Sequence, residues 1–241
     1  MVTNGIGDLF LPSRTGFAAL QLEYVVFLCI FGQFFSKRLH TMSKEKQNIT
    51  GHLREYRDDI KQAIDVMNKG GIILYPTDTI WGIGCDATNE EAVKRVFEIK
   101  KRNDAKALIT LVDSEAKIEF YVREVPDVAW QLMEVATRPL TIIYDGARNL
   151  APNLLAEDGS AGIRVTHEEF SQNLCMRMRR AIVSTSANIS GEPSPKCFAD
   201  IAPEILEAVD YVCTSRRNET QNPPASNIIK LGLGGEVKVI R

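Results

Sequence analysis

Short apolar runs alternate with helix-like stretches along most of this chain, and this alternation restricts its fold more than any other feature. Apolar residues recur three and four positions apart at Leu53, Tyr56, Ile60, Ala63, Ile64 and Met67, and Gly70 and Gly71 follow them. This spacing predicts an amphipathic helix that ends at the glycine pair. The next run, residues 72–75, is short and β-prone, which predicts a buried strand ended by Pro76.

The same alternation continues to the C-terminus. Thr88 and Glu91 predict a capping box for a second helix, whose far end carries Lys100, Lys101 and Arg102. Further helices are expected around residues 114–122 and from Pro126 at a first helical position. Apolar runs predict strands at residues 107–112, 140–144, 162–165, 181–184, 211–213, 227–231 and 237–240. A glycine-rich turn joins the last two strands into a hairpin, so we predict one α/β domain with a twisted, mixed sheet and flanking helices.

Charge and cysteine content restrict the class of protein. The chain of 241 residues has 29 basic and 31 acidic residues, a formal net charge of −2, so it does not have the charge of a protein that coats nucleic acid. Its five cysteines form no C-x-x-C pair, which favours a reducing compartment, and we expect a cytoplasmic protein. Three histidines without a Cys/His grouping predict no protein-bound metal.

The first 41 residues differ in character from the rest. Residues 16–35 are largely apolar, but Glu23 lies within the run and no signal-cleavage pattern follows it, so we expect no membrane association. Met42 begins a polar stretch that leads into the first predicted helix. We therefore expect residues 1–41 to be an extension outside the fold, and residues 42–241 to form the catalytic domain.

The most informative segment is residues 75–84, with the sequence YPTDTIWGIG. Thr77, Asp78 and Thr79 offer short hydrogen-bonding side chains, and Gly82 and Gly84 would let the backbone approach a ligand closely. An ordinary loop between a strand and a helix is the alternative interpretation of this segment.

Two other clusters suggest phosphate binding. Lys100, Arg102 and Lys106 form a basic group, which also fits charges at a helix C-terminus. The sequence STSANISG, residues 184–191, follows an apolar strand and places hydroxyls and an amide at its carboxyl end, where open α/β sheets bind ligands. Such groups can hold phosphate or carboxylate oxygens, whereas no G-x-x-x-x-G-K-S/T phosphate loop is present.

Together these segments resemble the YrdC-like family of threonylcarbamoyl-AMP synthases, of the TsaC type. The family pattern is a Y-P-T-D/E-T-x-Y/W-G-L/I-G loop, a K-x-R pair, a G-V/I-R-V/I strand and S-x-x-S-A-N-x-S-G. Here these motifs are residues 75–84, Lys100 with Arg102, residues 162–165, and STSANISG with Ser186 and Asn188. The resemblance covers residues 70–241 and implies the α/β twist fold with a concave basic cavity.

The resemblance implies an enzyme that condenses L-threonine, bicarbonate and ATP to threonylcarbamoyl-AMP and pyrophosphate. The product serves the threonylcarbamoyladenosine modification of tRNA, which implies contact with tRNA and hand-off to a threonylcarbamoyl transferase. Mg²⁺ is expected to arrive with ATP, which is a substrate. Carried over residue by residue, Thr79, Arg164 and Ser226 contact threonine. Catalytic roles fall to Lys100, Arg102, Ser186 and Asn188, and the nucleotide site adds Lys106, Ser160, Lys196 and Arg241.

The chain departs from the family pattern mainly around the amino-acid pocket. Asn103, Ala107 and Leu111 replace two prolines and a histidine of the pattern, and Asn227 stands where the pattern after Ser226 has threonine. Alternatives are a YciO-like paralogue or an RNA-binding module without synthase activity. Thiol chemistry at Cys85 or Cys175, with His167, is disfavoured because the sequence has no recognisable partner arrangement, and these cysteines are predicted to be small buried apolar residues.

Overall fold

The computed structural model describes residues 56–101, 108–220 and 225–241. The chain divides into two units, residues 1–54 and 55–241, and everything described below belongs to the second. The predicted domain boundary near residue 42 lies outside the described residues and stays a prediction.

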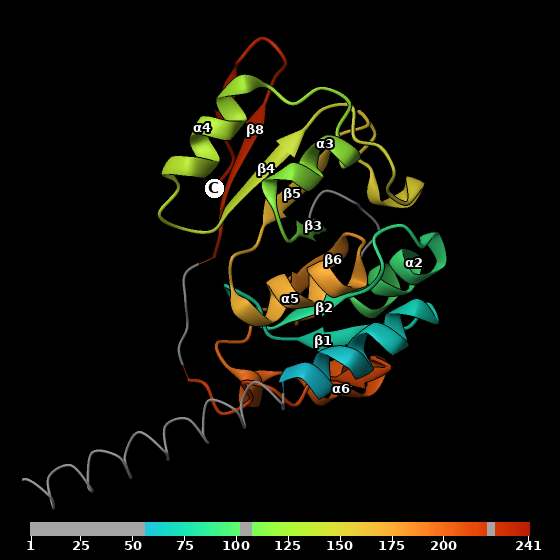
Figure 1. Cartoon of the computed structure of the whole chain (residues 1–241). Coiled ribbons are helices and arrows are strands. Elements are labelled where there is room, and N and C mark those ends of the chain that lie inside the picture. The colour runs from blue at the N-terminus through green and yellow to red at the C-terminus, as the bar shows by residue number, and fades with distance from the viewer. Residues whose placement is uncertain (1–55, 102–107, 221–224) are drawn as a thin grey trace, which may run out of the picture. The chain divides into compact units, whose positions relative to one another are not determined.

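A mixed β-sheet forms the centre of this unit (Figure 1). Its order is β7-β1-β2-β6-β3-β5-β4-β8-β9. The pairs β1–β7, β3–β5 and β4–β8 are parallel, and the other neighbouring pairs are antiparallel. The predicted mixed sheet and C-terminal hairpin are therefore confirmed. The strands are β1 (Ile73–Tyr75), β2 (Gly82–Gly84), β3 (Ile109–Val112), β4 (Leu140–Tyr144), β5 (Ala161–Val165), β6 (Ile182–Ser186), β7 (Tyr211–Val212), β8 (Asn227–Leu231) and β9 (Val237–Val239).

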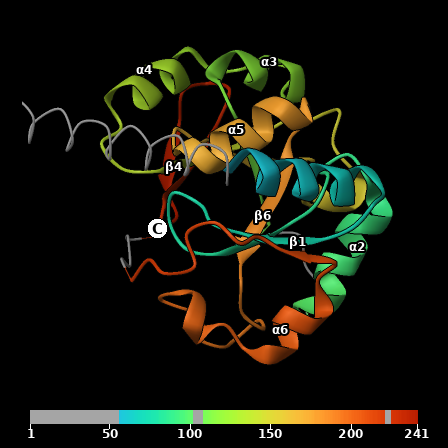
Figure 2. The ribbon, with the colours of Figure 1, turned by 60° about the horizontal axis from the view of Figure 1, so that its bottom comes forward.

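Helices cover both sides of this sheet. Figure 2 shows α5 and the helix through residues 56–68 on one side of β1 and β6, and α6 on the other side. Tyr56 and Phe170 meet edge to face at 5.6 Å between ring centroids, which joins the helix through residues 56–68 to α5. The helices are α2 (Glu90–Ile99), α3 (Ile118–Tyr121), α4 (Asp127–Val135), α5 (Glu169–Met178) and α6 (Pro203–Ala208), with short 3₁₀ turns η2 (Glu115–Lys117), η3 (Pro152–Leu154) and η4 (Phe198–Asp200).

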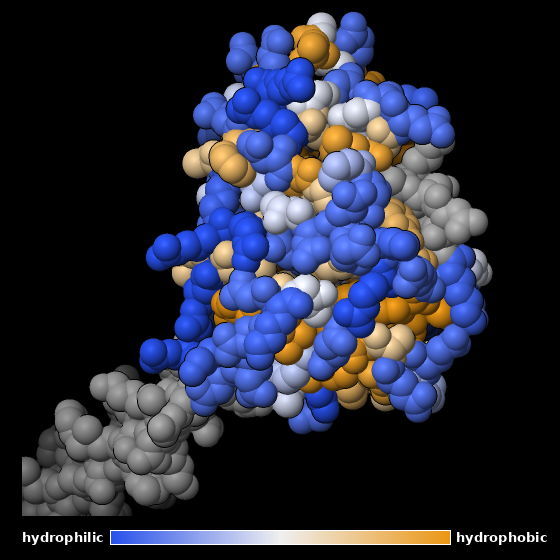
Figure 3. All heavy atoms as spheres, turned by 90° about the vertical axis from the view of Figure 1, so that its right-hand side faces the viewer, coloured by the Kyte–Doolittle hydropathy of each residue, from blue (hydrophilic) through white to orange (hydrophobic). Residues whose placement is uncertain are grey.

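The predicted apolar stripe of the first helix is buried at three of its positions and half-buried at Tyr56 and Ile64, and Leu53 lies outside the described residues. Ile60, Ala63 and Met67 are each at most 2% exposed. The helix ends where Gly70 adopts φ +78°, a left-handed conformation that suits glycine after a helix. Figure 3 shows the right-hand side of the view in Figure 1, where hydrophilic side chains cover most of the face and apolar side chains show between them. Within the described ranges, no helix has both the length and the apolar character needed to cross a membrane.

Two predicted helix starts are wrong by one residue. Asn89 caps α2, because its side chain accepts a hydrogen bond from the Ala92 N–H at 3.1 Å. Thr88 instead donates its hydroxyl to Asp86 at 2.7 Å, so the predicted capping box is not formed. Pro126 is the N-cap of α4 rather than its first helical residue. These shifts are small because a cap is decided by local hydrogen bonds that several neighbouring polar residues can make.

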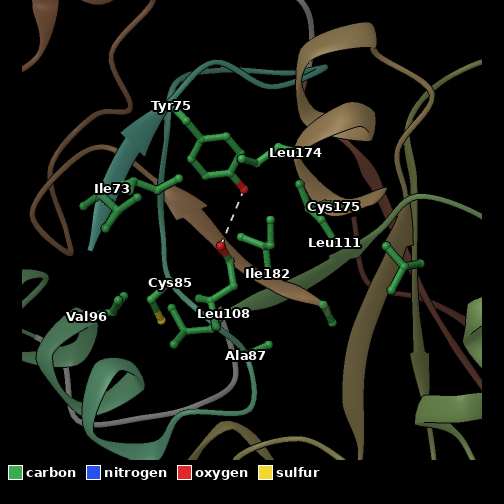
Figure 4. Packing of buried hydrophobic residues seen from close by; sticks show 14 of the residues in the cluster. Ile73, Tyr75, Cys85, Ala87, Val96, Leu108, Leu111, Leu174, Cys175 and Ile182 are labelled. Atoms are coloured by element: carbon green, nitrogen blue, oxygen red, sulfur yellow. Dashed lines mark hydrogen bonds between the residues drawn. The ribbon is translucent and has the colours of Figure 1, made fainter. Parts of the chain in front are cut away.

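Buried apolar side chains pack together into one hydrophobic core (Figure 4). Tyr75 is fully buried, and its hydroxyl donates to the Val183 carbonyl at 3.5 Å. Cys85 and Cys175 are also fully buried among apolar side chains, and burial raises the pKa of both thiols. A raised thiol pKa removes the reactive thiolate. The interpretation of these cysteines as apolar core residues therefore agrees with their surroundings.

Strand β2 was not expected from the sequence, which predicted a ligand-binding loop at Gly82 and Gly84. Both glycines lie in a strand that pairs antiparallel with β1 and β6. A Cβ atom at Gly84 would lie 2.6 Å from Tyr75 Cε1 and 2.8 Å from the Val183 carbonyl oxygen. Gly84 is therefore required by the close approach of neighbouring strands, whereas Gly82 lines the cavity described below.

Replacing Gly84 by alanine is expected to lower the free energy of unfolding by about 2 kcal/mol, because the added methyl group overpacks the core. Urea denaturation monitored by circular dichroism measures this change. The matched control is Gly162→Ala, where the nearest atom would lie at an ordinary contact distance of 3.4 Å. Equal losses in both variants would contradict the packing explanation.

Candidate active site

A cavity of about 650 Å³ lies among the ends of the central strands. Its polar lining includes six of the residues predicted for substrate binding, and they come from segments far apart in the sequence. Arg164 lies on β5 and Ser186 ends β6, whereas the others lie in loops or next to strands. Four lysine or arginine side chains and one carboxylate line it within the described residues. The predicted residues in the lining are Thr79, Ser160, Arg164, Ser186, Ser226 and Arg241.

The loop between β1 and β2 supplies Thr77 and Thr79. The Thr77 hydroxyl donates to the Ile80 carbonyl at 2.7 Å and accepts from the Thr79 N–H at 3.1 Å. The two threonine hydroxyls are also 3.1 Å apart. Both threonines are buried, so these bonds fix the loop as a tight turn whose side chains face the cavity.

Arg164 on β5 faces Asp78 of the same loop. Its Nη2 lies 2.9 Å from Asp78 Oδ1, and the two side chains are 3% and 12% exposed. Burial lowers the pKa of Arg164 and raises that of Asp78, although the opposite charge of each partner acts against both shifts.

The ion pair leaves hydrogen-bonding capacity unused. Arg164 Nε and Asp78 Oδ1 are both buried without a hydrogen-bond partner, because the 2.9 Å contact is close but poorly aligned. A buried guanidinium in a cavity wall with an unsatisfied N–H favours an anionic ligand, since an unused buried donor is costly. This arrangement suits a carboxylate.

The segment after β6 is held by Lys100, the C-cap residue of α2. Lys100 is 1% exposed, and its ammonium donates to the carbonyls of Ser186 at 2.6 Å and Asn188 at 2.7 Å. The Asn188 side-chain amide donates to the Glu192 carbonyl at 2.6 Å, so it also braces this turn.

Lys100 and Asn188 therefore differ from Ser186 in their position relative to the cavity. Ser186 lines it, whereas Lys100 and Asn188 are not among its lining residues. The catalytic role expected of Lys100 stays a prediction, and in this geometry two main-chain carbonyls hold its ammonium in the turn. Sequence showed a basic cluster at a helix end, but it could not show that one member points inward.

The cavity lining also includes Ser160 and a carboxylate, Asp158, that the sequence did not single out. Asp158 accepts from the Ser160 N–H at 3.0 Å and from its hydroxyl at 2.6 Å. Lys230 on β8 lies 2.7 Å from Asp158 Oδ2 and 3.0 Å from Asp145 Oδ1. The hydrogen bond from Lys230 is the main reason that the pKa of Asp158 lies well below its usual range, so this carboxylate is ionised at neutral pH.

The C-terminal residue closes the cavity near Ser226. Arg241 Nε donates to the Ser226 carbonyl at 3.2 Å, and the Ser226 and Thr141 hydroxyls are 3.0 Å apart. Thr141 is fully buried and pairs with Arg164 in the β4–β5 register. Ser226 and Arg241 therefore reach the same wall as Arg164 from the far end of the chain.

Three other residues were predicted for the nucleotide site. Arg102 and Lys106 lie outside the described residues, so their roles stay predictions. Lys196 is exposed, and its N–H donates to Asp200 at 3.1 Å, whereas the nearby Ser194 lines the cavity.

Thr77, which the sequence had indicated as a hydrogen-bonding side chain, also lines the cavity, whereas sequence reasoning missed Thr141, Asp158, Lys230 and Lys238. Lys230 and Lys238 lie in strands β8 and β9, where alternation of side chains could have indicated a polar face. Asp158 could not be found this way because it lies in a loop.

Across the described ranges, no group of three or more His, Cys, Asp or Glu residues is placed to hold a metal ion. His167 is exposed and lies 3.5 Å from Glu115, away from the buried cysteines.

Comparison with known proteins gives relatives over most of the described unit. Residues 65–241 match the Sua5/YciO/YrdC family model, whose description is "Telomere recombination". The threonylcarbamoyl-AMP synthase of Vibrio cholerae serotype O1 is 33% identical over 169 residues, which are 69% of this chain and 90% of that protein. The threonylcarbamoyl-AMP synthase of Stenotrophomonas maltophilia is 32% identical over 182 residues, covering 74% of this chain and 96% of that protein.

Solved structures with the same architecture include P. abyssi Sua5 in complex with L-threonine. That protein is 28% identical, with a TM-score of 0.66 over 71% of this chain, and the chain spans 50% of its length. E. coli YciO has a TM-score of 0.66 at 24% identity, covering 76% of this chain and 87% of that one, a likeness of fold alone.

Proposed function

Because the chain belongs to the Sua5/YciO/YrdC family, we propose that it is an L-threonylcarbamoyladenylate synthase. Its fold is the YrdC-like α/β fold that the sequence predicted. The enzyme uses L-threonine and ATP and forms an adenylate. Bicarbonate as the source of the carbamoyl carbon, and transfer of the product toward tRNA, belong to the same proposal.

The observation that carries the proposal is the composition of one cavity. Arg164, Thr79 and Ser226 at one part of its lining offer an unsatisfied guanidinium and hydroxyls for an amino acid. Ser186, Ser160 and Arg241 add hydroxyls and a cation suited to phosphate oxygens. A single space lined by both sets can hold an amino acid beside a nucleotide, as condensation requires.

The proposed reaction has two steps, carboxylation of threonine and adenylation of the resulting carbamate. The threonine amine attacks the carbon of bicarbonate, which forms N-carboxythreonine and water. A carboxylate oxygen of that carbamate then attacks the α-phosphorus of ATP, and the bond to the β-phosphate breaks to release pyrophosphate. We expect Mg²⁺ to arrive on the ATP phosphates, where it neutralises charge on the leaving group.

The protein groups act by positioning and charge in this scheme. Arg164 binds the threonine carboxylate, and Ser186 binds the nucleotide phosphates in the turn held by Lys100. Arg241, and Arg102 if it lies in the cavity as the sequence predicts, offset charge that develops at the phosphorus. No protein nucleophile is needed, because the carbamate oxygen is the attacking atom.

The proposal predicts that purified protein releases pyrophosphate only when ATP, L-threonine and bicarbonate are all present. A coupled pyrophosphate assay with each substrate omitted in turn measures this dependence, and D-threonine is the control for recognition of the amino acid. Release that does not depend on threonine, in folded protein, would contradict synthase activity. Binding of tRNA without pyrophosphate release would support the alternative of an RNA-binding module instead.

A further inference from the structure

The hydroxyl of Thr77 has a fully determined set of hydrogen bonds. It donates to the Ile80 carbonyl at 2.7 Å, and a carbonyl oxygen can only accept. A threonine hydroxyl has one proton, so the Thr77 hydroxyl has none left for its neighbour. It accepts from the Thr79 N–H at 3.1 Å, and its oxygen lies 3.1 Å from the Thr79 hydroxyl oxygen.

The direction of the bond between the two hydroxyls follows from this count. Because the Thr77 proton is directed to Ile80, the Thr79 hydroxyl must be the donor in the pair. The Thr77 oxygen then accepts two bonds, which uses both of its lone pairs. The Thr79 hydroxyl has then given its proton to Thr77, and its oxygen offers lone pairs to a group bound in the cavity.

The main chain of Thr77 is held as well. Arg216 Nη1 donates to the Thr77 carbonyl at 3.2 Å. The Arg216 guanidinium is fixed by Glu168 at 3.0 Å and by Glu219 at 2.7 Å. With its carbonyl and hydroxyl both bonded and its side chain 4% exposed, Thr77 has little freedom to turn its hydroxyl another way.

The Thr79 hydroxyl oxygen accepts hydrogen bonds, whereas Arg164 in the same cavity donates them. The unsatisfied Arg164 Nε suits a carboxylate, whereas the Thr79 oxygen suits a group that donates a hydrogen bond. A free amino acid presents both kinds of group, with a carboxylate at one end and N–H or O–H donors beside it.

We propose that Thr77 is a positioning residue that fixes the Thr79 hydroxyl as a hydrogen-bond acceptor for the amino-acid substrate. The proposal rests on the synthase function and adds the direction of one contact within it. It assigns Thr77 no direct contact with the substrate. Its effect is therefore expressed only through Thr79.

A double-mutant cycle tests this coupling. Thr77→Val keeps the side-chain shape but removes the oxygen that receives the Thr79 proton, so KM for threonine is expected to rise about tenfold. KM for ATP should change by less than about twofold, since the nucleotide contacts are untouched. In a Thr79→Ala background, Thr77→Val should change KM for threonine by less than about twofold, because nothing remains to be positioned.

Thr77→Ser is the matched control, since serine keeps the hydroxyl and should restore KM for threonine to within about threefold of the original value. Should Thr77→Val not fold, Thr77→Cys takes its place with the same expectations, because a thiol is a weak donor and acceptor. Additive effects in the cycle, or a serine variant as impaired as the valine variant, would overturn the proposal. Absence of threonine-dependent turnover in the unaltered protein would instead overturn the synthase function, which separates the two failures.

Discussion

Replacing Arg164 by lysine is expected to lower kcat/KM for threonine about a hundredfold, which corresponds to about 2.7 kcal/mol of lost transition-state stabilisation. Arg164 lines the cavity and presents a planar fork whose buried Nε has no hydrogen-bond partner while Nη2 faces Asp78. Lysine keeps the positive charge but provides a single ammonium that cannot serve Asp78 and a carboxylate in the same geometry. The loss should therefore appear mainly as a raised KM for threonine.

Steady-state pyrophosphate release at varied threonine and saturating ATP measures this effect. The matched control is Arg177→Lys, because Arg177 is exposed on α5 and is not a cavity residue. Thermal melting of both variants separates a binding defect from unfolding, since breaking a buried ion pair can also destabilise the fold. A change in KM for threonine below about threefold, in folded Arg164→Lys, would contradict the assignment of the carboxylate to Arg164.

Replacing Lys100 by methionine is expected to lower kcat/KM for ATP by more than about a hundredfold. Methionine fills a similar volume but cannot donate to the Ser186 and Asn188 carbonyls, which lie 2.6 and 2.7 Å from the ammonium. Leaving a buried carbonyl without a donor costs about 1 to 3 kcal/mol, so the turn should rearrange and move Ser186 away from the nucleotide.

Lys94→Met is the matched control for this variant, because Lys94 is exposed on the same helix α2. Titration with a non-hydrolysable ATP analogue, followed calorimetrically, should show weakened nucleotide binding in Lys100→Met and unchanged binding in the control. Full ATP affinity in a folded Lys100→Met protein would show that the turn does not depend on this lysine.

The regular part of the fold could be predicted from the sequence because it follows local patterns. The stripe with Ile60, Ala63 and Met67 gave the first helix, and apolar runs gave the bounds of β4 and β8 without error. Strand β2 could not be predicted this way. Two of its three residues, Gly82 and Gly84, have little intrinsic β-propensity, and the strand is stabilised because β1 and β6 pair with it on both sides.

Site residues could be predicted where a short sequence motif contains the binding groups. They could not be predicted where the contact joins residues far apart in the sequence. Ser186 in STSANISG lines the cavity, as expected of hydroxyls at the carboxyl end of a strand. The inward orientation of Lys100 depends on carbonyls 86 and 88 residues away, and the Thr141–Ser226 contact spans 85 residues. Such pairings arise from the tertiary fold, and no local pattern records them.

The central claim is that one cavity holds threonine and ATP together. A crystal structure of the protein with L-threonine and a non-hydrolysable ATP analogue tests it most directly. We expect the threonine carboxylate within hydrogen-bonding distance of the Arg164 guanidinium, and the phosphates in the same cavity, contacted by Ser186 and Arg102. Ligands in separate cavities, or Arg102 and Asn188 on opposite sides of the molecule with no shared cleft, would contradict the account.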